Sequence, residues 1–195
     1  MSGSRIALAA SCIFTLLAIY AKEHAVMLPF GAIMLLVLRL RSELPTGMPL
    51  RNVFVAILVQ CCISIFVVFQ IAGVLGSSYE PLFSEMLDLT VNISKDQIYP
   101  LSIANQMALF FKYLLIWTVP VPAWVSVDVR TAFPLVFDVW VLLRMLAYLA
   151  YMLTALVLLF RGGAKGLLGF SLLLPGCLFF SEFAAVRLQE PFVVY

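Results

Sequence analysis

The chain has 195 residues, of which 64% are hydrophobic and only 11% are charged. A soluble domain carries about 25% charged and about 45–50% apolar residues, so this composition excludes an ordinary soluble protein and predicts an integral membrane protein. The net charge of +2 is small and no basic arm is present, which argues against nucleic acid as a partner.

Five apolar stretches come close to the roughly 17–25 residues that a bilayer-spanning helix needs. Backbone groups in hydrocarbon must bond within their own segment, so these stretches are predicted to be helices of one all-α polytopic bundle over residues 1–195. The first is read as a retained helix and not as a cleaved signal, because apolar sequence continues past Cys12. The predicted spans are Ile6–Ala21, Ala25–Leu38, Val53–Leu75, Phe133–Phe160 and Gly166–Phe180.

A sixth stretch, Ile103–Val125, is predicted to be a re-entrant or interfacial helix. It contains Gln106 and Lys112, and it ends at Pro120 and Pro122, which break a helix. The alternative is a bundle of six spans, in which this stretch crosses the membrane completely.

The Lys and Arg content of the loops predicts the orientation, because cytoplasmic loops are enriched in both. The segment after Leu38 holds three arginines against one glutamate, and residues 161–165 hold two cations and no acid. Residues 76–100 hold four acids against one lysine and suit the outer side. The hairpin Lys22–His24 is then expected outside. Six spans would violate this rule at residues 161–165.

Several ionisable side chains are expected on the outer side. Arg144, Tyr148 and Tyr151 follow one another at i, i+4 and i+7, so they share a helical face. Asp138 and Arg144 are expected inside the fourth span, where an ionisable residue marks either a functional site or a buried pair. Lys22 could instead be a cation that snorkels from a helix end, and His24 is expected to be a solvated loop residue. A cationic set that would suit an anionic lipid head group comprises Lys22, Lys112, Arg130, Arg144 and Arg187.

No cofactor or metal site is expected from the sequence. The four cysteines all lie inside apolar runs, and they show neither a C-x-x-C motif nor Cys/His metal spacing. Glycine-rich nucleotide-binding loops are also missing from the sequence.

The stretch "YAKEHAVMLPFGAIML" (20–35) resembles a motif of membrane glycosyltransferases of the GT-C class, in particular O-mannosyltransferases with a tetratricopeptide-repeat tail. In that motif a Lys-Glu pair lies at the outer end of one helix and a proline-containing helix follows. Two further stretches are similar to this family, "NQMALFFKYLLIWTVPVPAWVSVDV" (105–129) and "RLQEPFVVY" (187–195).

The resemblance implies a membrane glycosyltransferase that takes a sugar from a polyprenyl-phosphate donor and transfers it to a protein acceptor at the outer membrane face. Lys22 would approach the donor phosphate and Glu23 would orient it. The expected location is a bacterial inner membrane, with membrane lipid as a further partner. The substrate-binding residues expected on these grounds are Lys22, Glu23, Asp128, Arg144, Arg187 and Glu190.

The chain also departs from the family pattern. Family members carry a catalytic aspartate in a first outer loop, whereas the loop here is only Lys22–His24, with Glu23 as its sole carboxylate. The chain is therefore expected to be part of a longer enzyme, and no catalytic residue is assigned. The alternative from a different class is a non-catalytic membrane subunit that binds lipid or a membrane partner. A small transporter ranks behind both, because the sequence has no internal repeat.

Overall fold

The structure, a computed structural model, describes residues 2–42, 49–70, 73, 95–119, 121 and 133–186. Every regular element in these residues is a helix, which confirms the predicted all-helical fold. The elements, with 3₁₀ helices marked η, are α1 (Ser2–Ala21), η1 (Glu23–Met27), α2 (Leu28–Arg41), α3 (Leu50–Gln70), α5 (Lys95–Thr118), α6 (Val139–Arg161), α7 (Gly163–Phe179) and η4 (Phe180–Ala184).

Four helical segments in the described part of the chain are long and apolar enough to cross a membrane, which makes this a multi-pass membrane protein. They correspond to four of the five predicted spans, and they cover His24–Arg41, Leu50–Gln70, Val139–Arg161 and Gly163–Ala184. The first predicted span forms a shorter apolar helix, Arg5–Ala21. The total of five spans therefore stays a prediction.

The chain divides into two compact units. Unit 1 comprises residues 1–73 and 152–181, and unit 2 comprises residues 74–151 and 182–195. The long helix α6 contributes its second half to unit 1 and its first half to unit 2. The sequence predicts one transmembrane domain over residues 1–195.

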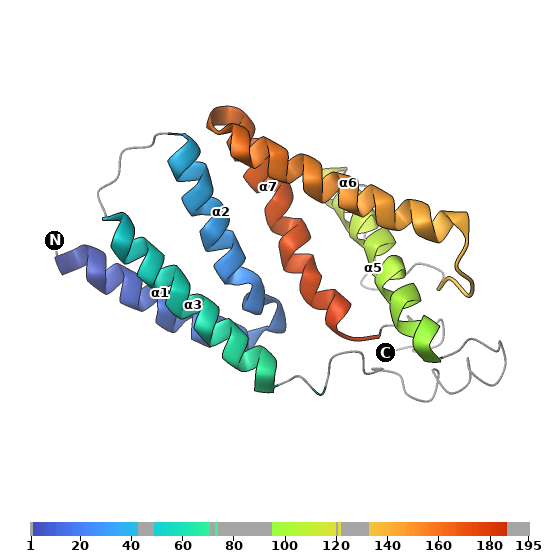
Figure 1. The fold of residues 1–195 in the computed structure, drawn as a ribbon, viewed down its shortest axis with the longest axis horizontal. Coiled ribbons are helices and arrows are strands. Elements are labelled where there is room, and N and C mark those ends of the chain that lie inside the picture. Colours follow the sequence, from blue (N-terminus) through green and yellow to red (C-terminus); the bar gives the residue numbers. More distant parts are fainter. Residues whose placement is uncertain are drawn as a thin grey trace. The chain divides into compact units, whose positions relative to one another are not determined.

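Unit 1 is a bundle in which α1 packs against α3, and α2 packs against both α3 and α7 (Figure 1). Its core lies between α2, the second half of α6 and α7, and includes Met34, Leu38, Ala155, Leu159 and Leu173. Gly169 of α7 lies so close to α6 that an added Cβ atom would be 2.3 Å from the backbone nitrogen of Leu159. Small residues permit such close backbone approach between membrane helices.

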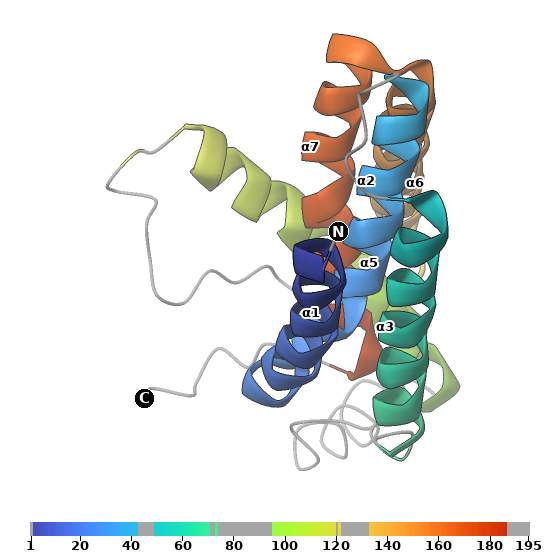
Figure 2. The same ribbon diagram turned by 90° about the vertical axis from the view of Figure 1, so that its left-hand side faces the viewer.

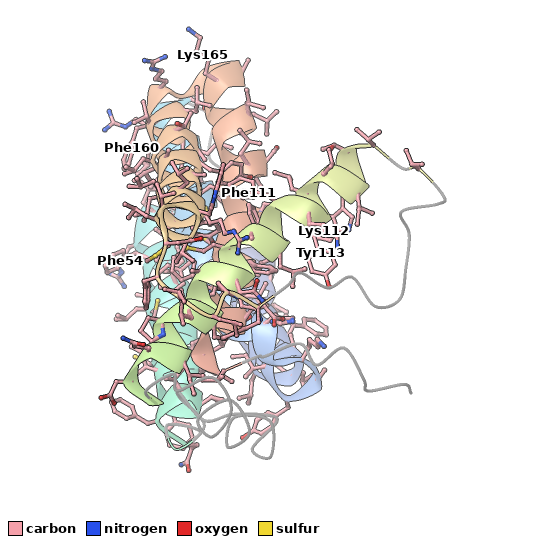
Figure 3. All side chains as sticks on the ribbon, turned by 90° about the vertical axis from the view of Figure 1, so that its right-hand side faces the viewer. Phe54, Phe111, Lys112, Tyr113, Phe160 and Lys165 are labelled. Carbon is pink, nitrogen blue, oxygen red and sulfur yellow. The ribbon has the colours of Figure 1, made fainter. Side chains whose placement is uncertain are left out.

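Most Lys and Arg residues of unit 1 lie at one of its two ends. The end of α2 meets the turn between α6 and α7 there (Figure 2), and the guanidinium of Arg41 lies 5.6 Å from the ring centroid of Phe160. Figure 3 labels Phe160 and Lys165 near this same end. We call it the basic end, and its cationic residues are Arg5, Arg39, Arg41, Arg51, Arg161 and Lys165.

The end of α2 and the turn between α6 and α7, which the charge pattern predicts to be on one side of the membrane, thus lie together. The end of α2 and the start of α7 share a hydrogen bond, in which Ser42 Oγ accepts from the N–H of Gly163 at 2.9 Å. That the basic end faces the cytoplasm, as the positive-inside bias predicts, stays a prediction.

Unit 2 is built on α5 and the first half of α6. One apolar cluster in it consists of Ile98, Leu101, Ala104, Val141 and Val186. A second cluster is aromatic and consists of Phe110, Phe111, Tyr148, Tyr151 and Phe183. Tyr99 also donates a hydrogen bond from its hydroxyl to the carbonyl oxygen of Phe183, at 2.8 Å.

The boundaries of two predicted elements are wrong. Helix α6 begins at Val139 and not at Phe133, because Asp138 is its N-terminal cap: Asp138 Oδ1 accepts a hydrogen bond of 2.8 Å from the N–H of Val141. Asp138 therefore lies outside the helix and is exposed, whereas the sequence analysis places it inside the span. Helix α5 begins at Lys95, earlier than the predicted Ile103, and Pro100 lies inside it near its N-terminus. Whether α5 is re-entrant stays a prediction.

Candidate functional site

Lys22 lies at a break between two helices. Its backbone is extended, with φ −154° and ψ 125°, and its N–H still bonds to the carbonyl oxygen of Ala18 at the end of α1. The carbonyl oxygen of Lys22 accepts from the N–H of Ala25, so the chain turns directly into η1. The Lys22 side chain is exposed. This break presents one ammonium group at the end of an apolar helix.

His24 connects this break to η4, which directly follows α7. The hydroxyl of Ser181 donates to the carbonyl oxygen of Leu178 at 2.9 Å, so it accepts a hydrogen bond from the Nδ1–H of His24. His24 is partly buried, and the prediction of a solvated loop residue is wrong. The reason is that η1 packs against α1, α2, α3 and α7 and does not project as a free loop.

The Lys22 break lies at the end of unit 1 opposite the basic end. Helices α2 and α7 are antiparallel. His24 of η1, which precedes α2, pairs with Ser181 of η4, which follows α7, whereas Ser42 after the end of α2 pairs with Gly163 at the start of α7. Within the described part of unit 1, Lys22 is the one Lys or Arg at its end. This arrangement agrees with the predicted outward orientation of the hairpin.

Glu23 is the first residue of η1, next to Lys22 in the chain. Three other predicted substrate-binding residues, namely Asp128, Arg187 and Glu190, lie outside the described residues, as does Arg130. Lys112 is exposed on α5 of unit 2, where it follows Phe111 (Figure 3).

Arg144 lies on the predicted face of α6, within unit 2. Tyr148 on this face is 1% exposed and Tyr151 is half-buried, and both contact the ring of Phe110 at 5.2 Å between ring centroids. Arg144 is half-buried, and its Nη1 is buried without a hydrogen-bond partner among the described residues. Lys22 belongs to unit 1 and Arg144 to unit 2.

A buried polar group on α5 was missed by the sequence reasoning. Ser102, Asn105 and Gln106 are each at most 1% exposed. They lie at i, i+3 and i+4 and so occupy one side of the helix. That spacing of polar residues within an apolar stretch is the signal that could have identified the group. From the sequence, Gln106 served only as a reason to doubt that Ile103–Val125 spans the membrane.

Lys22 and Arg144 offer cationic groups, and the buried polar residues of α5 offer neutral hydrogen-bonding groups. Lys22 offers a point charge to an anion, and Arg144 offers a planar set of donors. Within the described residues, no three His, Cys, Asp or Glu side chains lie together as a metal-binding group. In the comparisons with known proteins, no protein-family model, no curated protein and no solved structure matches this chain.

Proposed function

We propose that this chain is part of a membrane glycosyltransferase of a bacterial inner membrane. It would take a sugar from a polyprenyl-phosphate donor and transfer it to a protein acceptor at the membrane face away from the basic end. The observation that carries the proposal is the exposed ammonium of Lys22, held in a helix break at the end of unit 1 opposite the basic end.

The position of Lys22 suits an interfacial phosphate. A polyprenyl chain lies in the hydrocarbon and its phosphate lies at the boundary with water, which is the level that the end of a spanning helix reaches. A lysine there neutralises charge on the phosphate leaving group while the sugar is transferred. The resemblance of residues 20–35 to the GT-C motif supports the same role for Lys22 and a neighbouring role for Glu23.

The rigidity of the break further supports this role. The backbone of Lys22 bonds on both sides, to Ala18 and to Ala25, and the next element, η1, bonds to η4 through His24 and Ser181. A cation on a fixed backbone loses less conformational freedom when it binds a phosphate than one on a free loop.

The test compares Lys22→Ala with Lys165→Ala, a matched change of an exposed lysine at the opposite end of unit 1. Each variant of the full protein is reconstituted in vesicles and labelled with a photoreactive polyprenyl phosphate. We expect Lys22→Ala to lose at least tenfold in labelling and in sugar transfer, while Lys165→Ala keeps both. Equal labelling of the two variants would overturn the proposal and favour the non-catalytic membrane subunit.

A further inference from the structure

Two arginines of the basic end lie together where the end of α2 meets the turn between α6 and α7, within unit 1. A Cβ atom added to Gly162 would lie 2.3 Å from the carbonyl oxygen of Arg41, so the two backbones are in close contact. Arg161, the last residue of α6, directly precedes Gly162. Arg41 and Arg161 are therefore neighbours, and we call them the arginine pair.

The side chain of Arg41 extends toward the same end of α6. Its guanidinium lies 5.6 Å from the ring centroid of Phe160, which directly precedes Arg161 in the chain. Figure 3 labels Phe160 near this end of unit 1. A ring face attracts a cation but leaves the N–H donors of a guanidinium available. The ring of Phe160 thus positions Arg41 beside Arg161 without neutralising its charge.

Both arginines are exposed, and no carboxylate pairs with either of them within the described residues. The one acid among the described residues of unit 1 is Glu23, which belongs to η1 at the opposite end. The first turn of α7, which begins two residues after Arg161, also contains no acid. Two like charges repel each other when they lie close together, and a bound anion offsets that repulsion. The arginine pair is therefore suited to bind an anion from outside the chain.

Exposed apolar side chains lie next to the arginine pair along α6. Phe160 is 47% exposed, and Val157, one turn before Arg161 on the same side of the helix, is 53% exposed. Helix α6 is long and apolar enough to cross a membrane, so its last residue reaches the boundary between hydrocarbon and water. Cations at that boundary, with apolar side chains on the hydrocarbon side of them, match the phosphate and the acyl chains of a phospholipid.

We propose that the arginine pair binds the phosphate of an anionic phospholipid, such as phosphatidylglycerol, in the leaflet that the basic end faces. The two guanidinium groups donate hydrogen bonds to the phosphate oxygens, which is the geometry that arginine favours. Phe160 and Val157 contact the acyl chains, and a dissolved anion would lack that contact. Basic recesses between the ends of membrane helices are typical binding places for anionic lipid head groups. The site lies at the end of unit 1 opposite Lys22, and it needs no sugar transfer.

The experiment measures how strongly the full protein binds phosphatidylglycerol. Protein in neutral detergent micelles is titrated with the lipid, and native mass spectrometry gives the dissociation constant of the first bound molecule. We expect Arg41→Gln and Arg161→Gln each to weaken binding at least fivefold, because a cation near an anionic lipid contributes about 1 kcal/mol. The matched control is Arg51→Gln, which removes an exposed arginine of the same end, at the start of α3, and should change the constant less than twofold.

Arg161→Gln is the decisive variant. Its side chain makes no hydrogen bond or ring contact within the described residues, so its loss should leave the fold intact, whereas Arg41→Gln also loses the contact with Phe160. Equal weakening by Arg161→Gln and Arg51→Gln would overturn the proposal, since the attraction would then belong to the basic end as a whole.

Two further arms test the identity of the ligand. Wild-type protein that binds phosphatidylcholine as strongly as phosphatidylglycerol would contradict an anionic ligand. Inorganic phosphate that displaces the lipid at equal concentration would contradict a lipid site and indicate a site for dissolved anions. The titration contains neither polyprenyl phosphate nor sugar, so its failure would leave the proposed role of Lys22 standing. Loss of that role would likewise leave the lipid site standing.

Discussion

Ser42 and Gly163 are joined by a hydrogen bond although they lie far apart in the chain. The hydroxyl oxygen of Ser42 accepts from the N–H of Gly163, with 2.9 Å between the two atoms. Beside this bond, the carbonyl oxygen of Arg41 lies so close to Gly162 that an added Cβ atom would be 2.3 Å away. The turn between α6 and α7 is therefore held against the end of α2 by this hydrogen bond and by the close approach of Gly162 to the Arg41 backbone.

Gly162→Ala is expected to destabilise unit 1 strongly. Gly162 has φ +69°, a conformation that costs an L-residue about 1–2 kcal/mol, and its new methyl group would overlap the Arg41 carbonyl. Together these effects should lower the free energy of unfolding by about 2–4 kcal/mol. Unfolding of the purified protein in mixed micelles, followed by circular dichroism, measures the loss.

Gly163→Ala is the matched control for this change. Gly163 has φ +56°, but nothing lies within 4 Å of an added Cβ atom, and its N–H can still bond to Ser42. Only the backbone strain of about 1–2 kcal/mol then applies. If the two alanine variants were equally stable, the close contact between Gly162 and Arg41 would be refuted.

Gly169→Ala is expected to separate α7 from α6. Its Cβ atom would lie 2.3 Å from the backbone nitrogen of Leu159 and 2.7 Å from the carbonyl oxygen of Ala155, and backbone atoms cannot move aside as a side chain can. The variant should lose about 1–3 kcal/mol of unfolding free energy, as overpacked cores do.

Gly166→Ala makes the same chemical change one turn earlier in α7. The nearest atom to its Cβ would be Leu38 Cδ1 at 2.8 Å, the end of a flexible side chain, followed by the Leu159 carbonyl oxygen at 3.2 Å. The gain in helix propensity of about 1 kcal/mol offsets part of this crowding. The loss at Gly166 should thus be smaller than at Gly169 in the same unfolding measurement, and a reversed order would contradict the described helix contact.

The helices and the pairing of the basic loops could be predicted from the sequence because apolar length and loop charge are local properties. The start of α6 was misplaced because the apolar run from Phe133 hides the cap at Asp138, although Asp before an apolar helix is a typical N-terminal signal. The pairing of His24 with Ser181 could not be predicted. It depends on how two helices align, and neither helix encodes that alignment alone.

Asp138→Ala should remove the N-terminal cap of α6. The N–H of Val141 would lose its acceptor, which costs about 1 kcal/mol in typical helices. Asp138→Asn keeps a side-chain oxygen that can accept the same bond, so it should retain most of the stability. A lower melting temperature in the alanine variant alone supports capping. An equal loss in Asp138→Asn would instead indicate that the negative charge matters, through its interaction with the dipole of α6.

Side-specific labelling of Lys22→Cys and Lys165→Cys tests the orientation on which the proposed function depends. The background is a variant in which the four native cysteines, Cys12, Cys61, Cys62 and Cys177, are replaced by alanine. Both lysine side chains are exposed, and they lie at opposite ends of unit 1. A membrane-impermeant maleimide applied to intact cells should therefore label position 22 at once and position 165 only after permeabilisation.

Labelling of both positions from one side would contradict the antiparallel arrangement of α2 and α7. Labelling of position 22 only after permeabilisation would place Lys22 in the cytoplasm, where it could not serve transfer at the outer face.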